Sequence, residues 1–237
     1  METKMSVFAA VGLAGAMVVA VSGAAFAQSK TFEVAPFSGV DISSGLNADI
    51  TVGPTVSVTA QARDPRDLDD LRVEVRDDRL FAWIERSILD LRFGDRRITI
   101  HITTPRLDFL QASAGADVTA KGLAGQRTEA NASGGADLTV TSVEAGEMVA
   151  SASSGSDLRL SGTCQSATFD ISSGSDLDGR DLKCQDVAIR ASSGSDAEVF
   201  ASKSLVANAS SGSDIEVHGN PASVTKDASS GAGIELR

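Results

Sequence analysis

The stretch "SASSGSDLRLSG", residues 151–162, joins a cluster of small polar residues and a glycine to an aspartate that is followed by alternating apolar residues. Near-copies of this stretch recur through the second half of the chain. Successive copies are separated by 20, 20, 19, 20, 18 and 19 residues, counted from glycine to glycine. A period this constant indicates that each copy is one structural unit stacked on the next. The glycines are Gly115, Gly135, Gly155, Gly174, Gly194, Gly212 and Gly231.

Apolar residues alternate with polar ones on both sides of each glycine. Leu158 and Leu160 follow Gly155 in this way, and Ala150 and Ala152 precede it. A period of two residues is typical of a β-strand with one buried face. Each unit should therefore hold a strand on either side of a tight Ser-Gly corner, with a looser connection that could hold a third strand. No apolar stripe with the helical period of about 3.6 residues survives, which excludes helices.

The length of the repeating unit selects the architecture. A βαβ unit needs about 30 residues and a propeller blade about 40. About 20 residues fit one coil of a parallel β-helix, with three short strands and three turns. We therefore predict an all-β fold, a right-handed parallel β-helix with about 20 residues per coil. The alternative is an antiparallel meander, but identical corners favour stacking because small residues suit corners that lie on one another.

The first 27 residues have the features of a secretory signal peptide. A basic residue at Lys4 precedes an uncharged apolar run, and Ala25-Phe26-Ala27 fits the small-x-small cleavage pattern. We therefore expect residues 1–27 to be removed on export. We expect no later segment to span a membrane, because none is apolar enough.

The remaining chain divides by regularity. Residues 28–107 contain alternating strands and most of the aromatic side chains, so they are predicted to form the N-terminal β region that caps the solenoid. Within them, residues 41–52 look like a degenerate first copy of the repeat, with Gly45 and Asp49. Residues 108–237 are predicted to form the repetitive coils, continuous with the cap in one domain.

The composition restricts the class of partner. The formal net charge is -11 at pH 7. A surface this acidic repels phosphate backbones, so nucleic acid is excluded as an expected partner.

An aspartate stands two places after the glycine in six of the seven copies. In stacked coils these carboxylates would form a column with neighbours about 5 Å apart, which repel one another by roughly 1 kcal/mol in water. Corner N–H groups and serine hydroxyls could offset this repulsion by hydrogen bonding; a ladder of Ca²⁺ ions is the functional alternative. The aspartates are Asp117, Asp137, Asp157, Asp176, Asp196 and Asp214, and the serines considered are Ser156, Ser175, Ser195 and Ser213.

Cys164 and Cys184 lie 20 residues apart, at nearly the same place in adjacent coils. Stacking would place their Cα atoms near 5 Å, so an exported protein should join them in a disulfide, with buried free thiols as the alternative. A zinc site is not expected, because the two cysteines and two histidines do not cluster. Ca²⁺ is therefore the one cofactor that the sequence suggests.

Catalysis finds little support in the sequence. His101 lies in "ITIHITT" and His218 follows "IEV", and neither has a recognisable nucleophile or acid partner near it. The alternative function is a β-helix polysaccharide lyase or hydrolase, which would use carboxylates and cations clustered on one face. The candidate patch for that function is Asp157, Arg159, Asp176, Asp178, Arg180 and Arg190.

Several motifs in this order resemble a known bacterial family. They are "FSGVDISSGLNADITV" (37–52), "VEVRDDRLFAWIE" (73–85), "ITIHITTPRLDFLQASAGADVTAKGL" (98–123), "SGGADLTV" (133–140) and "SSGSDLRL" (153–160). The chain resembles the auto-transporter adhesin head domains called GIN domains, a secreted domain of unknown function. The resemblance implies a β-helical solenoid outside the cytoplasm, no assigned catalysis and, from the family's name, adhesion.

Together these observations predict a non-catalytic interaction or structural module of the bacterial cell envelope, in the periplasm or at the cell surface. Its expected partner is an envelope or surface protein or a glycan. Residues 219–237 form the last unit, in which Gly233 replaces the aspartate. We expect this coil to be a place where a second copy of the chain could pair.

Overall fold

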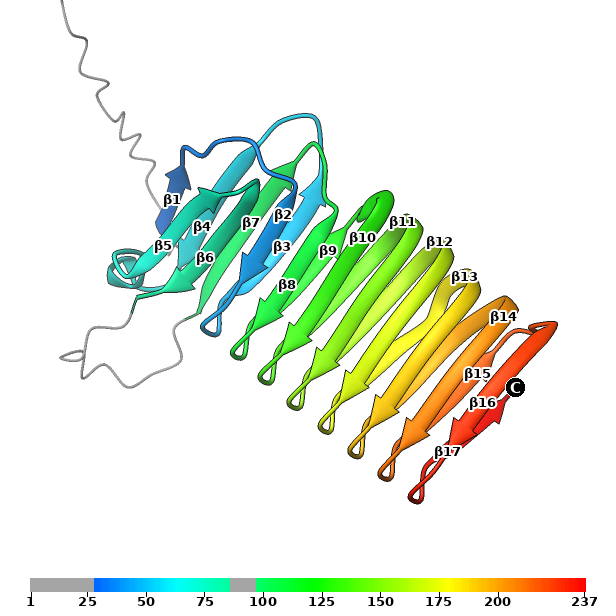
Figure 1. The fold of residues 1–237 in the computed structure, drawn as a ribbon. Helices are drawn as coiled ribbons and strands as arrows, with labels where there is room; N and C mark the ends of the chain where they lie inside the picture. The colour runs from blue at the N-terminus through cyan, green and yellow to red at the C-terminus, as the bar shows by residue number, and fades with distance from the viewer. Residues whose placement is uncertain (1–27, 86–96) are drawn as a thin grey trace, which may run out of the picture.

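The computed structural model describes residues 28–85 and 97–237, and the predicted signal peptide lies outside these residues. Within them, 17 strands form a single sheet that winds into an elongated solenoid, and one short 3-10 helix lies between two of the strands (Figure 1). The elements are β1 (Gln28–Phe32), β2 (Gly39–Ile42), β3 (Asn47–Val52), β4 (Ser57–Ala62), η1 (Pro65–Leu68), β5 (Leu71–Arg76), β6 (Arg79–Ile84), β7 (Ile98–Thr104), β8 (Phe109–Ser113), β9 (Asp117–Lys121), β10 (Ala124–Ser133), β11 (Asp137–Ser153), β12 (Asp157–Ser172), β13 (Asp176–Ser192), β14 (Asp196–Ser210), β15 (Asp214–His218), β16 (Ser223–Ala228) and β17 (Gly233–Leu236).

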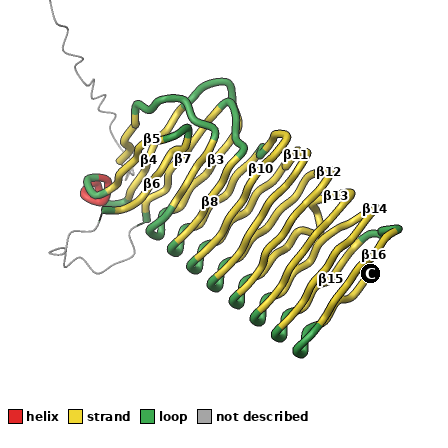
Figure 2. The backbone as a smooth tube through the Cα atoms, viewed as in Figure 1, coloured by secondary structure: helices red, strands yellow, loops and turns green. Residues whose placement is uncertain are grey.

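The repeats form the coils of a parallel β-solenoid, as predicted. Each of β11 to β14 pairs in parallel with the strand one coil away, which is incompatible with the antiparallel meander. The looser connection of each unit does not make a separate strand. β11 to β14 instead continue for 15 to 17 residues around a bend at the edge opposite the corners. Figure 2 shows the corners as a row of loops along the other edge.

The Ser-Gly corners reverse the chain because two consecutive residues adopt left-handed conformations. Ser154 has φ 60° and Gly155 has φ 69°, the backbone pattern of a tight I′-type turn. The Gly155 amide donates to the Ser173 carbonyl oxygen of the next corner at 3.1 Å. Similar bonds join the other corners, so each corner contributes to stacking as well as to the turn.

The serine after each corner glycine points into the molecule. Ser156 Oγ lies 3.0 Å from the main-chain oxygens of both Ala132 and Ser153, and Ser213 Oγ contacts the equivalent oxygens at 2.9 Å. The prediction that these hydroxyls hold the neighbouring aspartates is therefore wrong, because the inward direction turns them toward buried main-chain acceptors. The four serines are all buried: Ser156, Ser175, Ser195 and Ser213.

The alternating apolar residues fill a narrow core between the two faces of the solenoid. Leu158 and Leu160 on one face, and Phe169 and Ile171 on the other, are each at most 2% exposed. The last copy differs. Leu236 is 43% exposed, although its strand pairs in register with β15 like those before it. The other apolar residue of this copy, Ile234, is partly buried against the core, so the burial that the alternation predicts is incomplete in the last copy.

The N-terminal region extends the same stacking. β2 and β3 flank a corner at Gly45 and pair in parallel with β8 and β9, so residues 41–52 form the first coil. Asn47, and not Asp49, lies opposite Asp117. β6 and β7 pair with β2 and β3 on the other side. The antiparallel pairs β1–β4, β4–β7 and β5–β6 then replace the regular coils at this end.

In the described ranges, no helix combines the length and the apolar character that a membrane crossing would require.

Candidate functional site

The six aspartates form a column in register along one face of the solenoid. Asp137 pairs with Asp117 and Asp157, and the remaining aspartates follow in order through Asp176, Asp196 and Asp214. Asn47 continues the column at one end and Gly233 at the other. The carboxylates are therefore spaced by the distance between neighbouring strands, about 4.8 Å.

Neighbouring carboxylates of the column repel one another, and this repulsion contributes to raised pKa values at two of the aspartates. Partial burial, and then the negative charges of Asp157 and Asp117, raise the pKa of Asp137 above its ordinary value of 3.8. Partial burial, followed by Asp157 and Asp196, raises the pKa of Asp176 in the same way. Arg159 lies 3.4 Å from Asp157, and the Asp196 amide donates to Asp176. These contacts offset only part of the repulsion.

The raised pKa values make stability depend on pH in a defined direction. In the unfolded chain the two carboxyls return to their ordinary pKa of 3.8. Between that value and the raised value, the folded state binds more protons than the unfolded state. The free energy of unfolding must therefore fall as the pH rises through this interval, so the column costs stability at neutral pH.

We expect the double substitution Asp137→Asn/Asp176→Asn to stabilise the protein at neutral pH. The gain should be on the order of 1 kcal/mol. The part of it that comes from relieved repulsion between the carboxylates should shrink in high salt. It should also shrink as the pH approaches 3.8. Thermal melting across this pH range measures both effects.

The matched control for this substitution is Asp170→Asn/Asp227→Asn. It removes two exposed carboxylates from the opposite face, in register with Arg190 and Asn208. An equal gain in the control would show that total charge, and not the column, sets the effect.

A second outward-facing column lies two residues further along each strand. It changes from Thr119 and Thr139 in the earlier coils to acids in the later ones. We call the two columns together the acidic face. Its second column contributes, after Arg159, the side chains Asp178, Glu198, Glu216 and Glu235.

The acidic face is hollowed at the last coils. The hollow has a volume of about 380 Å³, and its lining includes Asp196, Glu198, Asp214, Glu216 and Glu235. Gly233 also lines it. A Cβ at this glycine would lie 2.6 Å from Asp214 Oδ1, so the Asp214 carboxylate occupies the space of a side chain there.

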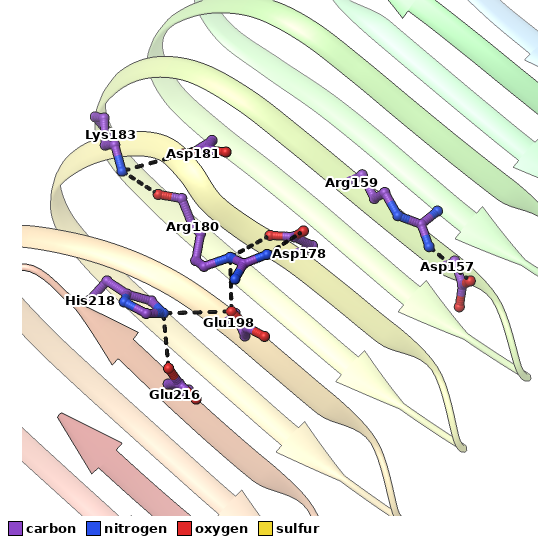
Figure 3. Close-up of polar contacts among 9 residues, drawn as sticks. All are labelled: Asp157, Arg159, Asp178, Arg180, Asp181, Lys183, Glu198, Glu216 and His218. Carbon is purple, nitrogen blue, oxygen red and sulfur yellow. Dashed lines mark hydrogen bonds and ion pairs between the residues drawn. The ribbon is translucent and has the colours of Figure 1, made fainter. Parts of the chain in front are cut away.

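A network of ion pairs crosses the second column (Figure 3). Arg180 contacts Asp178 at 3.2 Å and Glu198 at 2.9 Å. His218 Nε2 lies 3.1 Å from Glu216 Oε1 and 3.5 Å from Glu198 Oε2. Arg237 contacts the same Glu216 oxygen at 3.1 Å. The network joins side chains from four successive coils.

The network corrects the sequence analysis, which found no acid partner for either histidine. Glu216 lies two residues before His218, and alternation places both on the same side of β15; this spacing could have revealed the pair. Glu198 lies on the neighbouring coil, so only the register brings it close. His101 also has an acid partner, since its Nδ1 lies 3.3 Å from Asp49 Oδ2.

The candidate enzyme patch is divided by the fold. Asp157, Arg159, Asp176 and Asp178 belong to the acidic face. Arg180 joins them there through its contacts with Asp178 and Glu198. Arg190 does not, because it belongs to the second half of β13 on the opposite face, between Asp170 and Asn208. The structure therefore brings five of the six patch residues together and separates Arg190 from them.

The two cysteines meet at the bend between the faces. Cys164 and Cys184 form a disulfide with a Cα–Cα distance of 4.5 Å, and both are buried. They are register partners on β12 and β13, so the bond joins adjacent coils.

Comparison with solved structures finds the same fold in several bacterial proteins. The structure of a "putative adhesin" from Bacteroides fragilis has a TM-score of 0.81 at 19% identity, over 89% of this chain and 96% of that one. A "putative lipid binding protein" from Parabacteroides distasonis has a TM-score of 0.71 at 15% identity, over 89% and 96% of the two chains. A "putative adhesin" from the same species has a TM-score of 0.68 at 16% identity, with the same coverage.

A search of curated proteins finds no match. A family model does match, over residues 36–221. This range covers most of the chain, from the first coil through β15. The chain therefore belongs to the family described as "Putative auto-transporter adhesin, head GIN domain".

Proposed function

We propose that this chain is a non-catalytic binding module of the bacterial cell envelope, and that the acidic face is its binding surface. The observation that carries the proposal is the in-register column of aspartates on one face of the solenoid. Membership of an adhesin-type family supports the same role. The partner should be an envelope or surface protein, or a glycan, that carries positive charge.

The repeated spacing explains how such a surface could bind. A single exposed ion pair contributes at most about 1 kcal/mol, so one aspartate would hold a partner weakly. A row of carboxylates at about 4.8 Å intervals offers many such contacts at once, and their combined strength rises through effective concentration. Binding of this kind weakens steeply with salt. The enzyme alternative gains no support from the comparisons, in which the matched family and two of the structures above are described as adhesins.

The experiment compares two charge-neutralised variants for binding to a basic polymer, polylysine, and to bacterial envelope fractions. The test variant is Asp157→Asn/Asp176→Asn/Asp196→Asn. It should lose at least tenfold in affinity, or about 1.4 kcal/mol, since it removes the centre of the column. The matched control carries Asp170→Asn/Asp186→Asn/Asp227→Asn, three exposed carboxylates outside the acidic face.

The control should bind as the unaltered chain does. Equal losses of affinity in both variants would show that net charge, and not the acidic face, determines binding. No loss in either variant would show that the acidic face is not the binding surface. Binding to polylysine without binding to envelope fractions would support the charge of the acidic face as a binding determinant but would contradict the proposed envelope partner.

Calcium binding by the aspartate column remains part of the proposal. Carboxylate oxygens at this spacing suit Ca²⁺, which would also relieve the repulsion. Melting in excess Ca²⁺ should then raise the midpoint relative to melting with a chelator. An unchanged midpoint would exclude the ladder.

Self-association through the last coil also remains a proposal. β16 is exposed along its length, with Val224 41% exposed, and exposed strands can pair with another chain. Sedimentation velocity would reveal such a dimer.

A further inference from the structure

Three potential metal ligands converge on the acidic face at the last coils. One oxygen each from Glu198 and Glu216 and one ring nitrogen of His218 all lie within 4.8 Å of one another. Glu198 and Glu216 are register partners on β14 and β15, and His218 lies two residues beyond Glu216 on the same side of its strand. Regular β-structure therefore supports all three side chains.

Two of these atoms lack the partners that buried polar atoms normally have. His218 Nε2 and Glu198 Oε2 are shielded from solvent, yet neither forms a hydrogen bond of acceptable geometry. Their contacts are ion pairs, of which the shortest joins Arg180 Nε to Glu198 Oε2 at 2.9 Å. The two atoms lie 3.5 Å from each other, and His218 Nε2 lies 3.1 Å from Glu216. The side chains of His218 and Glu198 are 28% and 38% exposed, so only these atoms are shielded. A shielded polar atom without a directed hydrogen bond is unfavourable.

A cation between these atoms would resolve the conflict. When the imidazole carries its proton on Nδ1, the Nε2 lone pair faces two carboxylate oxygens, which is repulsive. A proton on Nε2 can form only one directed hydrogen bond, whereas a metal ion accepts all three atoms as ligands. We propose that Glu198, Glu216 and His218 bind a divalent first-row transition metal ion, with Zn²⁺ as the representative ion.

The donor set selects the class of metal. One imidazole nitrogen with two carboxylate oxygens is a ligand set that suits Zn²⁺ and related ions. Ca²⁺ prefers oxygen ligands alone, so this site differs in kind from the proposed calcium column. The adjoining hollow, which Glu198 and Glu216 line, gives an ion a route from solvent.

Two arginines compete with the metal for the same oxygens. Arg180 contacts Glu198 Oε2, and Arg237 contacts Glu216 Oε1. Their side chains are 49% and 61% exposed, and each has a second carboxylate partner, Asp178 at 3.2 Å and Glu235 at 3.5 Å. Each guanidinium can therefore move aside without losing all its pairing. This competition predicts that removing an arginine strengthens metal binding.

This site goes beyond the proposed function and is tested without any binding partner. Isothermal titration of the chain with Zn²⁺ should show one binding event. His218→Gln should weaken it at least tenfold, and Arg237→Gln should tighten it. His101→Gln is the matched control, because it removes the other histidine and its Asp49 contact; it should leave the affinity unchanged.

Absence of Zn²⁺ binding by the unaltered chain would overturn the proposal. So would equal binding by the His218→Gln variant, or equal losses in both histidine variants. Melting without metal checks that each variant folds, and Glu216→Gln takes the place of His218→Gln if that variant does not. A tightening in Arg237→Gln separates a metal site from a purely structural ion network, in which the arginine would only stabilise.

Discussion

Replacing Gly162 by alanine should destabilise the solenoid by about 3 kcal/mol or more. This glycine has φ 137° at the bend of β12. An added Cβ would lie 2.2 Å from the carbonyl oxygen and 2.5 Å from the nitrogen of Val143 on the preceding coil. Both atoms are main chain, so the clash cannot be relieved by a side-chain rotation. The coils would have to separate where they are hydrogen-bonded.

Gly155→Ala is the matched control for this substitution. Gly155 also has positive φ, at 69°, but nothing lies within 4 Å of the position that an alanine Cβ would take. It should lose only about 1 kcal/mol, the cost of a left-handed alanine. Urea denaturation measures both free energies of unfolding. Equal losses would show that backbone conformation alone, and not the contact between coils, makes Gly162 necessary.

Removing the disulfide with Cys164→Ser/Cys184→Ser should lower the free energy of unfolding by about 3 kcal/mol. The bond closes a loop of 20 residues, and the entropy of the unfolded chain rises when that loop opens. The two serines would also place hydroxyls where both cysteines are now buried, which adds to the loss. Urea denaturation without reductant measures the change.

The unaltered chain in the presence of reductant supplies the control for the disulfide. With reductant present during urea denaturation, its free energy of unfolding should fall toward that of the double variant. The free energy of unfolding of the double variant should be the same with and without reductant. A double variant as stable as the oxidised chain would mean that the disulfide adds nothing to the stacking of β12 on β13.

The coil architecture could be predicted because the sequence repeats its constraints. Each unit carries the same corner, the same alternation and, in all but the last, the same aspartate. A copy that departs from the pattern can therefore be assigned its structure from the other copies. The cysteine pair followed from the same period, and the structure has the two residues as register partners. The first coil, residues 41–52, could also be predicted from the repeat, although the residue that lies in register with the aspartate column is Asn47 and not Asp49.

The contacts of individual side chains could not be predicted in the same way. Ser156 and its equivalents were expected to hold the aspartates but face buried carbonyl groups. Arg190 was grouped with Arg180, yet the two lie on opposite faces because β13 passes around the bend between them. The partners of His218 were missed, since one of them comes from another coil.

The sequence alone determined the repeat, the inward and outward alternation and the direction in which the units stack, because these depend on the backbone period that every copy shares. Only the tertiary structure decided which outward side chains meet. Bends and register shifts, such as the one between Gly179 and Lys183, differ from coil to coil. The cluster of Glu198, Glu216 and His218 therefore depends on three-dimensional register and not on any local motif.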